Sequence, residues 1–127
     1  MPHPNYILLY VTDPSASAAF YTALLACPPV EASPTFALFA LDSGLMLGLW
    51  ARPGVEPAAS AGGGGGELAL SVASEAAVDA CFADWQARGL TVLQHPVRMD
   101  FGYTFVIADP DGHLWGIVWM DPAATPH

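Results

Sequence analysis

The chain has 127 residues, of which 54% are hydrophobic and only 12% are charged, and its formal net charge is −9. Its three cations are arginines, too few to displace the counterions of a nucleic acid or to hold an anionic membrane surface, so we expect neither partner. We find no apolar run of the roughly 18 residues that a membrane span needs and no secretory signal, so the expected location is the cytoplasm.

The first half of the chain predicts a strand, a helix and three further strands. The apolar run 6–11 predicts a buried strand. Asp13 followed by Pro14 predicts a helix start, because Asp caps an N-terminus and proline suits the first turn. The proline pair at 28–29 ends that helix. Strands are then expected at 30–33, 36–41 and 45–50.

Residues 51–66 predict a flexible linker, because the segment ends in five consecutive glycines. The second half then repeats the order of the first. Ser74 predicts the start of its helix and Gly89 the end. Asp109-Pro110-Asp111-Gly112 predicts a tight turn before the last strand. The strands of this half are expected at 67–72, 90–97, 103–108 and 113–120.

The two halves also share a short pattern. An Asp/Gly turn followed by an apolar strand with a central glycine occurs at 42–50 around Gly48 and at 109–119 around Gly116. The chain therefore predicts a β-α-β-β-β unit written twice within one α+β domain, residues 1–127. The modules are expected at 4–50 and 67–120, joined by the linker 51–66. Cys27 and Cys81 are expected to be free thiols.

This order resembles the vicinal oxygen chelate superfamily, which includes glyoxalases, extradiol dioxygenases, fosfomycin-resistance enzymes and bleomycin-resistance proteins. The resemblance covers residues 5–120. It is carried by the duplication, the turn 109–112, the opener 10–13 and the pair Phe20-Tyr21. The sequences of segments 34–36, 48–50 and 100–102 are most similar to the phenazine-resistance and bleomycin-resistance branch. The resemblance implies a homodimer in which paired modules form a cupped mixed β-sheet that holds a ligand.

Metal-dependent members of that superfamily take their ligands from four strand positions. Projected onto this chain, those positions are Tyr6, Gly48, Glu67 and Gly116. Only Glu67 is a good ligand for a divalent cation, and one carboxylate does not make the three or four protein ligands that Zn or Fe sites use. We therefore expect no metal, no cofactor and no catalytic residue.

Side chains alternate across a strand, so parity predicts which of them share a face with these four positions. That face mixes aromatic rings, glycines, a carboxylate and a hydroxyl, which suits a pocket with flat walls and a few polar anchors. The opposite parity is almost uniformly apolar and is expected to pack under the helices. The predicted ligand-binding residues are Tyr6, Tyr10, Gly48, Trp50, Glu67, Ser71 and Gly116 by parity, with Asp100, Phe101 and Tyr103 as additional walls or anchors.

Trp50 and Tyr6 are expected to sandwich a planar ring, with the glycines leaving room for it. Some of these aromatic residues fit a core or dimer interface equally well, and Glu67 fits a strand carboxylate paired with Arg52 or Arg98. Trp85 and Trp115 are expected in the core.

The leading hypothesis is non-catalytic binding and sequestration of a planar aromatic antibiotic or metabolite. The motifs favour phenazines, whereas the charge of −9 favours bleomycin-like cations, and both stay open. One alternative is a metal-dependent lyase or dioxygenase with a displaced metal site. Another is an interaction module whose cup is closed by its own side chains.

Overall fold

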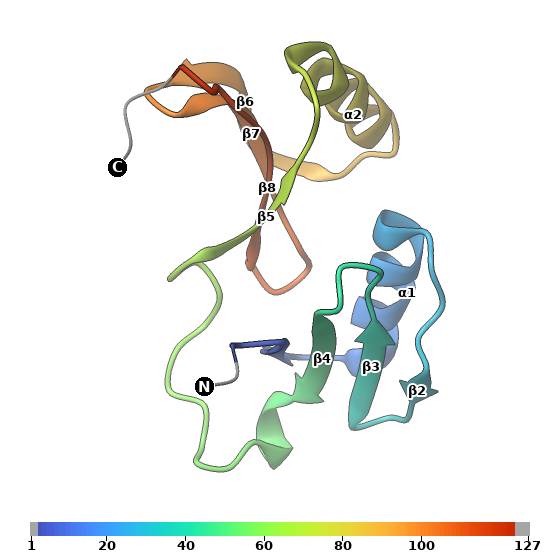
Figure 1. Ribbon diagram of the computed structural model, residues 1–127. Coiled ribbons are helices and arrows are strands. Elements are labelled where there is room, and N and C mark those ends of the chain that lie inside the picture. Colours follow the sequence, from blue (N-terminus) through green and yellow to red (C-terminus); the bar gives the residue numbers. More distant parts are fainter. Residues whose placement is uncertain (1–2, 124–127) are drawn as a thin grey trace. The chain divides into compact units, whose positions relative to one another are not determined.

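The computed structural model describes residues 3–123 and divides the chain into two compact units, Met1–Gly62 and Gly63–His127 (Figure 1). The boundary falls after the first glycine of the run of five. Over the described residues each unit holds one α-helix and one four-stranded mixed sheet, so the α+β class and the duplicated β-α-β-β-β order are confirmed. The homodimer and the joining of both units in one domain stay predictions.

The first unit is built from β1 (Tyr6–Val11), α1 (Pro14–Leu25), β2 (Glu31–Ala32), β3 (Phe36–Ala40) and β4 (Met46–Ala51), with strand order β1-β4-β3-β2. The β1–β4 pair is parallel and the others are antiparallel. Asp13 caps α1 as predicted, since its carboxylate accepts from the N–H groups of Ser15 and Ala16. Helix η1 (Arg52–Gly54) occupies the start of the expected linker, which is thus not unstructured throughout.

The second unit has the equivalent topology. It contains β5 (Glu67–Ser71), α2 (Glu75–Ala87), β6 (Thr91–Met99), β7 (Gly102–Ala108) and β8 (Leu114–Met120), with strand order β5-β8-β7-β6. The Ser74 hydroxyl accepts from the Ala77 N–H at the start of α2, as predicted. After α2 the backbone of Gly89 turns through φ +79°, a conformation that favours glycine.

Each helix packs on one face of its own sheet and buries the apolar set that parity predicts. The buried side chains include Val11, Tyr21, Phe39, Leu47 and Leu49 in the first unit, and Val78, Trp85, Phe105, Ile107, Trp115 and Ile117 in the second. Trp85 and Trp115 are therefore core residues, as expected, and Cys27 and Cys81 are free thiols. We call the other side of each sheet its helix-distal face.

Candidate functional site

The second unit carries a cavity of about 400 Å³ on the helix-distal face of its sheet. Its floor comes from β7 and β8, where the lining residues Thr104, Val106 and Leu114 alternate with residues that face α2. Phe105, between the first two, contacts the rings of Phe82 and Trp85. The other lining residues are Glu67 from β5, Leu93, Gln94 and Met99 from β6, and Phe101 from the turn before β7.

The lining is mostly apolar and holds three polar side chains. The Thr104 hydroxyl donates to the Ile117 carbonyl oxygen at 2.8 Å, so its proton is already used. Glu67 offers a carboxylate and Gln94 an amide. An apolar cavity with a few convergent polar groups is the usual form of a small-molecule site.

Gln94 lies in the cavity because β6 is bulged. Val92 pairs with Ile107, but Gln94 pairs with Val106, so one extra residue of β6 is inserted between these two pairs. Without the bulge, Gln94 would have the parity of Phe105 and face α2. The bulge reverses that parity and places Leu93 and Gln94 together on the cavity wall.

In the first unit, the predicted residues share the helix-distal face of the sheet. Tyr10 lies opposite Trp50 across the β1–β4 pair, and their rings meet edge to face with centroids 6.4 Å apart. The Tyr6 ring covers Gly48, since a Cβ on that glycine would lie 3.1 Å from Tyr6 Cε1 and 2.7 Å from Leu8 Cδ2. The ring that contacts Trp50 is thus Tyr10, and the room above Gly48 is filled by the chain itself.

In the second unit, Glu67 and Phe101 line the cavity, and Gly116 lies beneath the Glu67 carboxylate. Ser71 is exposed on the strand that carries Glu67, and Asp100 is exposed in the turn between β6 and β7. Neither lines the cavity. The four residues of the first unit, Tyr6, Tyr10, Gly48 and Trp50, belong to the other sheet.

Tyr103 lies on the opposite face of the second sheet from the cavity. Its hydroxyl donates to Asp79 Oδ1 of α2 at 2.7 Å, and its ring lies 5.5 Å beneath the Arg98 guanidinium. The hydrogen bond to the Asp79 carboxylate raises the pKa of Tyr103 above its ordinary value. The structure thus gives Tyr103 a place between sheet and helix rather than in the ligand pocket.

The two arginines considered as partners of Glu67 bind other groups. Arg98 pairs with Glu75 at 2.5 Å, and Arg52 Nη1 donates to the Ala61 carbonyl oxygen at 3.0 Å. Glu67 itself is exposed at the start of β5. In the second unit Arg98 is thus paired with Glu75 rather than with Glu67, whereas a pair between Glu67 and Arg52 stays a prediction.

The residues present do not fit the metal site of the metal-dependent relatives. Over residues 3–123, no three His, Cys, Asp or Glu side chains form a group that could hold a metal ion. At the four projected positions, both glycines lack a donor and are covered by Tyr6 and Glu67. A single carboxylate then remains as a strong ligand. Within the same residues, no helix is long and apolar enough to cross a membrane.

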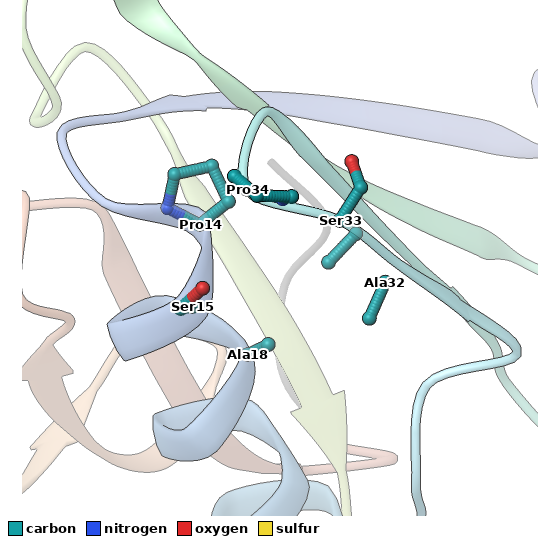
Figure 2. Close-up of a pocket in the computed structure, with 7 residues that line it drawn as sticks. Pro14, Ser15, Ala18, Ala32, Ser33 and Pro34 are labelled. Carbon is teal, nitrogen blue, oxygen red and sulfur yellow. The ribbon is translucent and has the colours of Figure 1, made fainter.

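The first unit has a smaller cavity of about 230 Å³, between the start of α1 and the turn that joins β2 to β3 (Figure 2). Its lining is small and uncharged: Pro14, Ser15, Ala18, Ala32, Ser33, Pro34 and Ala37. Asp13 already satisfies the free N–H groups of this helix end. The cavity has neither the volume nor the polar anchors of the one in the second unit.

Sequence reasoning missed several lining residues. Thr104 and Val106 could have been found from the tight turn 109–112, because it pairs Ala108 with Leu114 and thereby sets the parity of β7. No local sequence signal indicates the bulge that places Leu93 and Gln94 on the cavity wall. Met99 lies beyond the expected end of its strand.

Known proteins resemble the chain over almost its whole length. It is 29% identical over 121 residues to the phenazine antibiotic resistance protein EhpR of Enterobacter agglomerans, covering 93% of this chain and 92% of EhpR. A protein of Agrobacterium tumefaciens solved by solution NMR is 54% identical with a TM-score of 0.87, covering 95% of this chain and 99% of that one.

A glyoxalase-related enzyme of Fulvimarina pelagi is 24% identical with a TM-score of 0.80, covering 98% of this chain and 96% of that one, which shows a shared fold alone. The family described as Glyoxalase/Bleomycin resistance protein/Dioxygenase superfamily matches residues 3–117. The chain therefore belongs to the glyoxalase/bleomycin resistance protein/dioxygenase superfamily.

Proposed function

We propose that this protein binds and sequesters a planar aromatic antibiotic or metabolite without transforming it. The observation that carries the proposal is the cavity of about 400 Å³ on the helix-distal face of the second sheet. Its volume suits a fused-ring ligand, and among its apolar residues Phe101 and Met99 suit the flat face of a ring.

The chemistry of the lining favours binding over catalysis. The lining has one carboxylate and neither a histidine nor a cysteine, so it lacks the pair of groups that general acid–base or nucleophilic catalysis uses. The name of the relative EhpR, a phenazine antibiotic resistance protein, supports the same class of ligand.

Isothermal titration calorimetry with a panel of phenazines, mitomycins and bleomycins tests the proposal. We expect one compound class to bind with micromolar or tighter affinity and to be recovered unchanged by mass spectrometry. Phe101→Ala removes an aromatic wall and is expected to weaken binding at least tenfold. Val30→Ala is the control, because it removes an exposed apolar side chain in the first unit.

Two outcomes contradict the proposal in different ways. Stoichiometric Fe, Zn, Ni or Mn in the purified protein, together with conversion of a bound compound, would support the lyase or dioxygenase alternative. No heat from any compound would favour an interaction module that holds no small ligand.

A further inference from the structure

We propose that the cavity of the second unit selects planar ligands whose polar edge is neutral or cationic and carries an N–H donor, and that Glu67 makes it discriminate against carboxylates. This inference rests on the proposed function. It concerns the charge of the ligand: the net charge of −9 favours a cation, whereas the sequence motifs favour phenazines.

The first argument is the charge of the lining. Glu67 is its single ionisable side chain, and none of the lining residues is basic in the described part of the chain. An ionised carboxylate only accepts hydrogen bonds, so a ligand carboxylate beside Glu67 would meet a like charge and no matching donor. An amide, amine or protonated ring nitrogen would instead donate to it.

The second argument is where the cations lie. Arg98 pairs with Glu75 on the side of the sheet that faces α2, and Arg88 pairs with Asp84 of the same helix. Arg52 donates to the Ala61 carbonyl oxygen in the first unit. Each of the three arginines thus has a partner outside the cavity, and the chain has no lysine.

The third argument concerns the remaining polar groups. The Thr104 hydroxyl donates its one hydrogen to the Ile117 carbonyl oxygen, so toward a ligand its oxygen can only accept. Gln94 is then the lining side chain that can donate, and its amide can also accept. Glu67 and Thr104 can thus accept hydrogen bonds, and the Gln94 amide can both donate and accept. These groups match a ligand whose polar edge combines N–H donors with one acceptor, such as a carboxamide.

A pair of isosteric probes tests the inference: phenazine-1-carboxamide and phenazine-1-carboxylate, each titrated calorimetrically into the full chain. We expect the carboxamide to bind at least tenfold more tightly. Glu67→Gln replaces the carboxylate by an amide that can donate, so it should reduce this preference at least fivefold, mainly by strengthening carboxylate binding.

Asp84→Asn is the matched control, because it changes the net charge equally but lies on α2, which packs on the other face of the sheet. The preference should be unchanged in this variant. Gln94→Met should weaken the carboxamide about fivefold, whereas Gln86→Met, at an exposed position of α2, should not.

The outcomes separate the two proposals. Equal or tighter binding of the carboxylate, or a preference that Glu67→Gln leaves unchanged, would overturn the charge selection while sequestration stands. Unaltered carboxamide binding in Gln94→Met would overturn the role of Gln94. If neither phenazine binds and no other planar compound does, the proposed function and this inference fall together.

Discussion

The carboxylate of Glu67 lies over Gly116, so that a Cβ built on this glycine would stand 3.4 Å from Glu67 Oε2. The first unit repeats the relationship with Tyr6 over Gly48. The register agrees, because Tyr6 pairs with Met46 and Glu67 with Leu114, each two residues before the glycine. At the strand positions where metal-using relatives would carry ligands, the side chains of Tyr6 and Glu67 thus cover the backbone of Gly48 and Gly116.

Gly48→Ala should destabilise the protein by about 1 kcal/mol, because the new methyl group would displace Leu8 and Tyr6, which must move together. Gly116→Ala should be close to neutral, because the nearest atoms belong to the end of an exposed, flexible Glu67 side chain. Urea unfolding of both variants measures the difference. An equal loss in both would show that the Tyr6 ring and the Leu8 side chain are not packed over Gly48 as the structure has them.

The turn 109–112 depends on the buried side chain of Asp109. Its Oδ1 accepts from the N–H groups of Asp111 at 2.9 Å and His113 at 2.8 Å. Asp109→Ala removes both hydrogen bonds and should cost about 2 kcal/mol in the free energy of unfolding. Asp109→Asn keeps an acceptor oxygen and should cost roughly half as much. Urea unfolding measures both, and equal losses would contradict this account.

Local sequence signals predicted the fold well where hydrogen bonding is local. Asp13 and Ser74 cap their helices as expected, and the turn at 109–112 lies between β7 and β8. Strand ends were less accurate: β2 has only two residues, although four were expected. Val30 and Ser33, at the ends of the expected strand, still donate backbone hydrogen bonds to the carbonyl oxygens of Leu38 and Phe36. Pro34 lies just beyond Ser33 in the turn to β3 and has no N–H to extend the ladder.

The site was harder to predict than the fold, because its composition depends on register. Glu67 has the parity of the predicted ligand face and lines the cavity, because β5 pairs regularly with β8. Tyr103 was assigned to the wall, but the register with β8 puts Thr104 there and turns Tyr103 toward Asp79. A bulge such as that at Leu93 shifts parity by one residue and has no reliable sequence signature.

Tyr103 should make stability depend on alkaline pH. Its pKa is raised in the folded chain by the hydrogen bond to Asp79, so the folded state favours the protonated phenol. The resulting stabilisation is complete below the unfolded pKa of about 10 and is lost as pH rises through the higher folded value. The stability difference between the native chain and Tyr103→Phe should therefore be constant to about pH 9 and shrink above about pH 10.

Ultraviolet absorbance titration gives a second measurement of this group. The native chain should show a late-titrating tyrosine that Tyr103→Phe removes. Asp79→Asn should lower the pH at which Tyr103 titrates, because it removes the carboxylate whose hydrogen bond stabilises the protonated phenol. A late titration that survives Tyr103→Phe would assign it to another tyrosine.

The run of five glycines contains one position with a packing requirement. A Cβ on Gly63 would stand 2.6 Å from the carbonyl carbon of Gly112 and 2.6 Å from the backbone nitrogen of His113. Both are backbone atoms of the turn before β8, which is fixed by Asp109 and moves only with loss of its hydrogen bonds. A Cβ on Gly65 would meet nothing within 4 Å.

Gly63→Ala should therefore destabilise the protein by about 2 kcal/mol, whereas Gly65→Ala should be neutral or slightly stabilising through the lost freedom of the unfolded chain. Urea unfolding of the two variants gives the comparison, and each serves as the other's control for composition. If both are neutral, the run acts as a uniform linker, as the sequence first indicated. If only Gly63→Ala is destabilised, the second unit begins at the contact between Gly63 and the turn, ahead of its first strand.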